Sequence, residues 1–184
     1  MRRGLDQALD DYLVLLAQGG SRDAFARLAA RWSPKLMAFA ARSLGTTEAA
    51  KDAVQDTWES AWRNVRRLDD PARFRAWIYA IAARKCADAL RAKYRGQRIE
   101  NAARANELLD DGGIDAESRQ GARIDLADAL KALPPDQRIA ISLFFGEDMD
   151  VAEIASITGA PPGTVKSRLF AARKALRASL GEEK

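Results

Sequence analysis

The sequence has few of the residues from which metal centres and disulfide frameworks are built. Its 184 residues include no histidine and a single cysteine, Cys86, so no disulfide can form within the chain and a zinc site is not expected. Cys86 falls inside a helical pattern, which predicts a buried structural thiol. The sequence also lacks a glycine-rich loop that could hold phosphates. It therefore indicates no cofactor, no metal and no catalytic residue, and argues against an enzyme.

Long apolar runs and β-branched runs are scarce as well. No stretch approaches the roughly 20 apolar residues that a membrane-spanning helix needs. Asp6, Asp10 and Asp11 interrupt the region where a secretory signal would be apolar, so we expect a cytoplasmic protein without membrane insertion. Because alanine is abundant and β-branched runs are few, the composition favours an all-α fold.

Periodicity and turn residues divide the chain into two small helical domains joined by a flexible linker. The domains are the N-terminal block, residues 6–95, and the C-terminal block, residues 123–184. Between them, residues 96–122 lose their periodicity, and the stretch 99–117 carries six acidic residues around Gly112-Gly113. This composition is typical of a flexible, acidic linker. Within the N-terminal block, helices are predicted at 5–17, 22–44 (bent near Pro34), 47–65 and 73–94.

The pattern at residues 150–180 is typical of a helix-turn-helix. Asp150 and Glu153 form a capping-box pattern before a short apolar helix, and Gly159 suits the left-handed position that ends it. A proline pair can open the next helix, which carries five basic and no acidic residues between positions 163 and 178. In a chain with a net charge of +4 and a pI near 9.4, such a helix suits a DNA groove. A solvated basic surface is the alternative.

Helix 47–65 is predicted to have an apolar face and an acidic face on opposite sides. The acidic face consists of Asp52, Gln55, Asp56 and Glu59. A group of acids and an amide does not suit nucleic acid, because phosphates would repel it. From spacing alone, the acidic face is either ordinary solvated surface or a site for another protein, and the solvated surface is the more common case.

Helix 73–94 is predicted to be basic along one side. Its basic residues include Arg73, Arg84, Lys85 and Arg91. Tyr79 and Tyr94 add aromatic rings near this side, whereas Phe74 and Trp77 are expected to pack in the core. Arginines interleaved with aromatic rings can hold phosphates and stack exposed bases, so this helix is a second candidate for nucleic-acid binding.

Four motifs occur in a definite order along the chain. Residues 52–58 read DAVQDTW and are followed by Ala61-Trp62, residues 74–82 read FRAWIYAIA, residues 130–137 read LKALPPDQ, and residues 163–169 read GTVKSRL. In this order the motifs resemble the sigma-70 family of bacterial transcription initiation factors, and its small extracytoplasmic-function (ECF, group 4) type in particular. The resemblance covers residues 11–95 and 124–180.

The resemblance implies an alternative sigma factor with a region 2 domain and a region 4 domain, which binds core RNA polymerase and directs recognition of the −10 and −35 promoter elements. It implies that core polymerase docks on Asp52, Gln55, Asp56, Glu59 and Trp62. It implies that the −10 element is contacted by Arg73, Tyr79, Arg84, Lys85 and Arg91. It implies that the −35 element is read by Thr164, Lys166, Ser167, Arg168, Phe170 and Arg173.

Two further expectations concern partners. Many members of the family are held by an anti-sigma factor, so such a partner is expected beside core polymerase and promoter DNA. The alternative function is that of a stand-alone helix-turn-helix regulator, which would bind DNA without polymerase and usually as a dimer. Run-off transcription with purified core polymerase separates the two.

Overall fold

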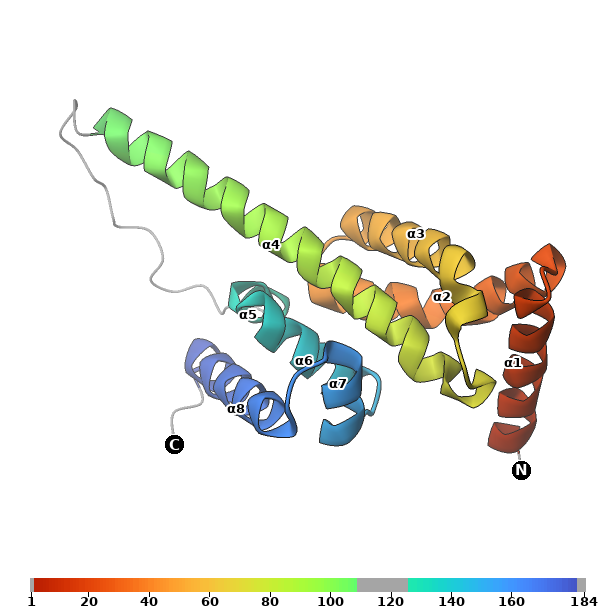
Figure 1. The fold of residues 1–184 in the computed structure, drawn as a ribbon. Helices are drawn as coiled ribbons and strands as arrows, with labels where there is room; N and C mark the ends of the chain where they lie inside the picture. The colour runs from red at the N-terminus through yellow and green to blue at the C-terminus, as the bar shows by residue number, and fades with distance from the viewer. Residues whose placement is uncertain (1, 109–125, 182–184) are drawn as a thin grey trace.

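The computed structural model describes the backbone of residues 2–108 and 126–181, and over these residues it is all-α, as the sequence predicts (Figure 1). The N-terminal block contributes α1 (Arg2–Gln18), α2 (Arg22–Leu44), α3 (Thr47–Asn64), the 3-10 turns η1 (Val65–Arg67) and η2 (Pro71–Arg73), and α4 (Phe74–Leu108). The C-terminal block contributes α5 (Leu126–Ala132), α6 (Pro135–Gly146), α7 (Val151–Thr158) and α8 (Pro162–Ser179).

The boundaries of α2 follow local sequence signals. The Ser21 side chain accepts a hydrogen bond from the Ala24 amide at 3.2 Å and so satisfies one of the free N–H groups at the helix start. Gly45 ends the helix with φ at 77°, a conformation that glycine adopts without steric cost. Between these caps, α2 runs through Pro34 as one helix.

Helix α4 is longer than the sequence indicates. The sequence predicts that the linker begins at Gly96, but the backbone stays helical to Leu108. One glycine costs a helix only about 1 kcal/mol relative to alanine, and the arginines, glutamine, glutamates and alanines on either side are good helix formers. Residues 96–108 of the expected linker are therefore helical in this structure. The rest of that linker, 109–122, lies outside the described residues.

A buried apolar core holds the N-terminal block together. Leu13 of α1, Leu28 and Phe39 of α2 and Ile78 of α4 are all fully buried. Cys86, on the buried side of α4, is also fully enclosed, and this burial raises the pKa of its thiol to about 12. The expectation of a buried structural thiol is confirmed.

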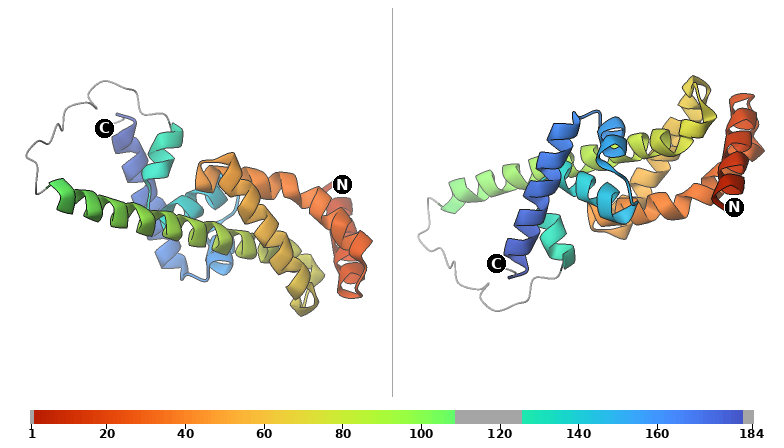
Figure 2. Two further views of the ribbon diagram at one scale, coloured as in Figure 1. Left: turned by 90° about the horizontal axis from the view of Figure 1, so that it is seen from above. Right: turned by 90° about the horizontal axis from the view of Figure 1, so that it is seen from below.

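The two blocks pack against each other. Figures 1 and 2 show α6 and α7 lying beside α4, and the buried apolar core continues from α2 and α4 into α6, α7 and α8. Polar contacts follow the same boundary. Tyr94 of α4 donates from its hydroxyl to the Leu133 carbonyl oxygen at 2.9 Å, and Arg138 of α6 donates to the Ser43 carbonyl oxygen at 3.3 Å. The two small helical domains that the sequence predicts are therefore docked on each other in this structure.

Candidate nucleic-acid and protein-binding surfaces

The predicted helix-turn-helix is formed by α7 and α8, and its details match the sequence signals. Asp150 and Glu153 make both bonds of the capping box, at 2.8 and 2.9 Å between side-chain oxygen and backbone nitrogen. Gly159 has φ at 65° and ends α7, and Pro162 is the first residue of α8. The motif is held in place by buried apolar residues, among them Ile154 of α7 and Leu169 of α8.

The outward side of α8 presents most of the side chains predicted to read the −35 element. Lys166, Ser167 and Arg173 are exposed, and Ser167 donates a hydrogen bond to the Thr164 carbonyl oxygen at 2.9 Å. Phe170 is 69% exposed on this cationic helix. An aromatic ring is costly to leave in water, and apolar contact with a thymine methyl is one of the ways in which a recognition helix reads a base.

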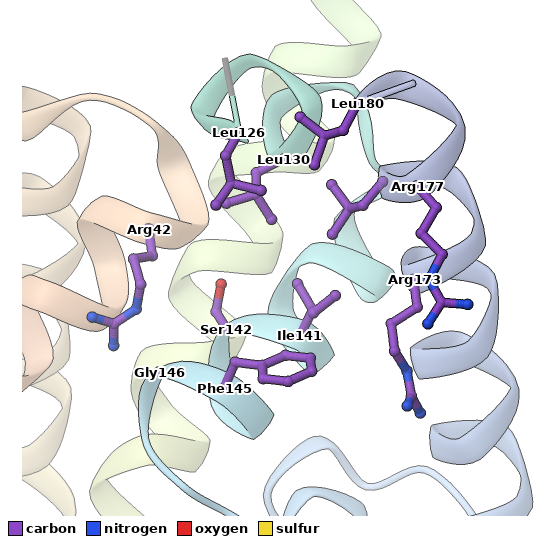
Figure 3. Close-up of a pocket in the computed structure, with 11 residues that line it drawn as sticks. Arg42, Leu126, Leu130, Ile141, Ser142, Phe145, Gly146, Arg173, Arg177 and Leu180 are labelled. Atoms are coloured by element: carbon purple, nitrogen blue, oxygen red, sulfur yellow. The ribbon is translucent and has the colours of Figure 1, made fainter. Parts of the chain in front are cut away.

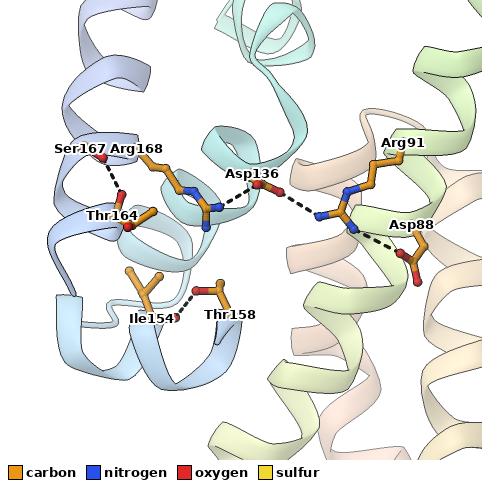
Figure 4. A network of polar contacts seen from close by, with 8 residues as sticks. All are labelled: Asp88, Arg91, Asp136, Ile154, Thr158, Thr164, Ser167 and Arg168. Atoms are coloured by element: carbon orange, nitrogen blue, oxygen red, sulfur yellow. Dashed lines mark hydrogen bonds and ion pairs between the residues drawn. The ribbon is translucent and has the colours of Figure 1, made fainter. Parts of the chain in front are cut away.

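Arg168 lies differently from its neighbours, because its guanidinium faces α4 and α6. It donates to Asp136 at the start of α6 at 2.7 Å, and the same carboxylate accepts from Arg91 of α4 at 3.1 Å (Figure 4). Arg91 also contacts Asp88 at 3.3 Å. A residue expected to read the −35 element and a residue expected to contact the −10 element thus share one acidic partner.

Four of the five side chains predicted to contact the −10 element lie at or near the surface, Arg73 at the end of η2 and the other three on α4. Arg73, Arg84 and Arg91 are exposed, and half-buried Lys85 lies 3.8 Å from Asp56 of α3. Arg84 and Arg91 line a cavity of about 530 Å³ between α4 and the C-terminal block, and Arg168 and the half-buried ring of Trp77 line it too. Phe74 is fully buried, as expected, whereas Trp77 only packs against the edge of the core.

Tyr79 does not lie on the basic side of α4, so the prediction that it stacks on promoter bases is wrong for this structure. Its ring is 1% exposed and makes edge contacts with Trp32 and Phe39 at 6.3 and 5.6 Å between ring centroids. Its hydroxyl donates to Glu147, at the C-terminal end of α6. Burial, and then the bond to this carboxylate, raises the pKa of Tyr79. The buried ring and the paired hydroxyl together leave no surface for a base.

The acidic face of α3 is exposed to solvent. Asp52, Gln55, Asp56 and Glu59 lie opposite the buried side of the helix. Gln55 donates to Glu59 at 3.3 Å, and Glu59 also pairs with Arg63 at 3.2 Å. Trp62 extends this face toward the C-terminal end of α3; it is 37% exposed, and its ring lies 4.9 Å from that of Phe25. All five side chains predicted to bind polymerase therefore lie on one side of α3.

The structure also contains an apolar groove that the sequence analysis missed (Figure 3). The groove has a volume of about 430 Å³, and its edge carries Arg42, Arg173 and Arg177. Its apolar lining comes from Leu126, Leu130, Ile141, Phe145, Leu176 and Leu180. Phe145 is 65% exposed. The sequence signal was the run from Ile139 to Phe145, which holds more apolar residues than one buried helix face requires.

Two other kinds of site were searched for in the described part of the chain. Residues 2–108 and 126–181 contain no group of three or more side chains that could hold a metal ion. Within the same ranges, no helix combines the length and the apolar character needed to cross a membrane.

The fold and these surfaces define an all-helical DNA-binding protein, with a helix-turn-helix in one block and an arginine-bearing helix in the other. Comparison with known proteins gives the family. The profile described as Sigma-70 region 2 matches residues 28–96, and that described as Sigma-70, region 4 matches residues 123–176. RNA polymerase sigma factor CarQ of Myxococcus xanthus is 34% identical over 167 residues, which cover 89% of this chain and 92% of that protein. ECF RNA polymerase sigma factor SigW of Bacillus subtilis is 27% identical over 170 residues, or 88% and 91% of the two chains.

Solved structures agree with the sequence matches. CnrH in complex with the cytosolic domain of CnrY has a TM-score of 0.66 and 30% identity, covering 96% of this chain and 99% of that one. The sigma factor RpoE in complex with the anti-sigma factor NepR, from Bartonella quintana, has a TM-score of 0.59 and 28% identity, covering 89% and 100%. The chain belongs to the sigma-70 family, and within it to the ECF sigma factors, alternative sigma factors that direct transcription initiation.

Proposed function

We propose that this chain docks on core RNA polymerase through the acidic face of α3 together with Trp62, and that α4 and α8 recognise the −10 and −35 promoter elements. Its contribution is binding in the cytoplasm, and the polymerase performs the chemistry. The observation that carries the proposal is the separation of charge: the acidic face lies on α3, whereas exposed basic side chains are spread along α4 and α8. One surface suits a basic protein, and the other two suit DNA.

Docking through α3 is supported by the exposure of every residue that it requires. Asp52 and Asp56 point away from the buried side of the helix and contribute little to the fold. The one ion-pair partner of Asp56 in the described residues is Lys85 at 3.8 Å, and the Asp56 side chain is 60% exposed, so a cationic partner can still reach it. The nearby Trp62 can add a partly exposed aromatic ring, a residue type that often anchors protein interfaces. Contacts between exposed charges give binding that weakens as salt rises.

Promoter reading through α8 is supported by a cationic helix with an exposed ring in a helix-turn-helix. Lys166, Ser167, Phe170 and Arg173 face solvent, and Thr164 and Arg168 are half-buried beside them. A bidentate side-chain contact to a base is worth about 1–3 kcal/mol of discrimination.

At the −10 element, we propose that Arg73, Arg84, Lys85 and Arg91 hold the DNA backbone. With Tyr79 buried, we assign base stacking to Trp77, whose half-buried ring lines the same cavity as Arg84. Stacking of a base on an aromatic ring contributes about 1–3 kcal/mol.

An anti-sigma factor is the further partner that we propose. Two of the similar solved structures are complexes, CnrH with CnrY and RpoE with the anti-sigma factor NepR. In this chain, the apolar groove between α5, α6 and α8 could accept the apolar side of a helix, and the three arginines at its edge favour acidic flanking residues. Exposed Phe145 provides an apolar contact for such a helix.

The docking assignment is tested by charge reversal on α3. Asp52→Lys combined with Asp56→Lys should weaken binding to purified core polymerase roughly tenfold or more, with an unchanged circular dichroism spectrum. The matched control is Asp69→Lys combined with Asp128→Lys, two exposed acids elsewhere, which changes the net charge equally. Equal affinities of the two double variants for core polymerase would contradict the docking assignment. A stand-alone regulator would bind DNA specifically while showing no affinity for core polymerase in any variant.

A further inference from the structure

The first helix of the chain exposes an apolar stripe to solvent. One side of α1 is buried against the rest of the N-terminal block through residues such as Leu13 and Ala17. A helix that serves only this core is expected to be polar on its opposite side. On α1 that side instead carries Leu5, Tyr12 and Leu15, which are 71%, 57% and 56% exposed. Single exposed apolar residues are common, but a group of them on one helix face marks a contact surface.

The spacing of this stripe is that of a helix-pairing surface. Leu5, Ala8, Tyr12 and Leu15 are separated by three, four and three residues, as the a and d positions of a coiled coil are, and all four are exposed. These four residues are the α1 seam. At a rise of 1.5 Å per residue, the seam extends for about 15 Å along one face of the helix.

The charge around the α1 seam selects the class of partner. Residues 4–19 contain three aspartates and no lysine or arginine. Asp6 and Asp10 pair with Arg31 of α2, at 3.2 and 2.8 Å. Asp11, beside the seam, accepts a hydrogen bond from Gln7 at 2.7 Å and has no ion pair among the described side chains. An apolar stripe with an acidic edge repels anionic lipid and nucleic acid, so it fits an apolar helix of a protein.

A second copy of α1 provides a helix with a complementary seam. When two seams run antiparallel with Ala8 opposite Tyr12 of the second copy, Leu5 lies opposite Leu15 of that copy. All four seam positions are then paired, and in both inner layers a large ring meets a small side chain, which favours close packing. A shift of the register by one heptad leaves two of the four seam residues without a partner. The seam is therefore complementary to itself in one antiparallel register.

We infer that the free chain forms a weak antiparallel dimer through the α1 seam. This inference does not rest on the proposed function. Figures 1 and 2 show α1 at the opposite end of the molecule from α8, so the contact leaves the helix-turn-helix of each copy exposed. A single pair of short helices buries less than the roughly 1,200 Å² of a stable interface, so the dissociation constant should be on the order of 10 µM.

The first test is sedimentation velocity of the full chain, at concentrations from about tenfold below to tenfold above that value. The mass should rise from that of a monomer towards that of a dimer. Leu5→Gln combined with Leu15→Gln should weaken the dimer at least tenfold, because each dimer loses four leucines from its interface. The circular dichroism spectrum should not change, since both side chains are exposed in the monomer. The matched control is Leu126→Gln combined with Leu180→Gln, which removes two exposed leucines of the C-terminal block and should dimerise like wild type.

Three outcomes of this test would overturn the inference. The first is a wild-type chain that stays monomeric over the whole concentration range. The second is a control that loses association while the Leu5 and Leu15 variant keeps it, because the contact would then lie in the C-terminal block. The third is association that weakens as salt rises, since that would indicate pairing of acidic and basic surfaces. In the α1 dimer the Asp11 side chains of both copies flank the same pair of helices, so salt should leave association unchanged or strengthen it.

Cross-linking tests the register with single substitutions. Ala8→Cys and Tyr12→Cys are made in separate chains, each with Cys86→Ala, and the two chains are mixed and oxidised. Antiparallel pairing places positions 8 and 12 in one layer, so the mixture should yield several-fold more cross-linked dimer than either chain alone. Ala8→Cys mixed with Ala26→Cys, an exposed position on α2, is the control and should yield little. Chains that cross-link better with themselves than with each other would show parallel pairing, and equal yields in all mixtures would show random collision; either result would overturn the inference.

Discussion

Tyr79→Phe removes one hydroxyl from the boundary between the two blocks and leaves the aromatic packing in place. The hydroxyl donates to Glu147, whereas the ring contacts Trp32 and Phe39 through its edges and is 1% exposed. Phenylalanine keeps those ring contacts, so the substitution creates almost no cavity. The expected loss is that of one hydrogen bond to a charged acceptor.

The size of the expected destabilisation depends on the contacts that Glu147 retains. A hydrogen bond to a charged group is worth about 1.5–3 kcal/mol, and Glu147 retains its ion pair with Arg42 after the substitution. We therefore expect about 2 kcal/mol of destabilisation, which for a chain of this length lowers the melting temperature by about 4–8 °C. Urea titration followed by tryptophan fluorescence measures it, and Trp32, next to Tyr79, is buried. The matched control is Tyr12→Phe, whose side chain is 57% exposed and which should stay within about 0.5 kcal/mol of wild type.

A change of less than about 0.5 kcal/mol for Tyr79→Phe would refute the reasoning, because a nearly buried carboxylate would then have lost a donor at no cost. Such a result would show that the Tyr79 hydroxyl does not hold Glu147 in the free chain.

Three further substitutions test other parts of the account. Asp150→Ala removes the capping box of α7 and should lower the free energy of unfolding by about 1 kcal/mol, measured by thermal unfolding. Arg138→Met deprives buried carbonyl oxygens of their donor and should cost about 1–3 kcal/mol, whereas exposed Arg27→Met should be neutral; equal stabilities would contradict the role of Arg138. Arg168→Ala should reduce the preference of holoenzyme for a cognate over a scrambled −35 duplex, whereas Arg177→Ala should weaken both equally and flatten the salt dependence. An equal loss of affinity for both duplexes with Arg168→Ala would show that Arg168 contacts the DNA backbone and does not read a base.

The helix-turn-helix could be predicted from the sequence because its signals are local. The capping box of Asp150 and Glu153, the left-handed Gly159 and the proline start of α8 each act within a few residues, so neighbouring letters suffice to recognise them. The acidic face of α3 could also be predicted from the sequence, because that helix buries only one side.

The location of Tyr79 could not be predicted, because α4 is packed on more than one side. It contacts α2 and α3 within its own block and α6 and α7 of the other, so inward-facing residues do not form one stripe, and a tyrosine near arginines resembles a surface residue. The pairing of Asp136 with Arg91 and Arg168 spans 45 and 32 residues and depends on docking between blocks. Local pattern carries no information about such contacts. The continuation of α4 past Gly96 was missed because the apolar periodicity weakens there, although the residues are good helix formers and one glycine costs a helix little.

The central claim, that this chain is a sigma factor acting through α3, is tested most directly by run-off transcription with purified core polymerase. The account predicts that core polymerase alone gives no discrete transcripts from a pool of promoter fragments, and that adding the chain gives discrete start sites. The Asp52→Lys, Asp56→Lys variant should lose most of that signal, whereas the Asp69→Lys, Asp128→Lys control should keep it. Transcripts that do not change on adding the chain, or that persist fully with the α3 variant, would contradict the account.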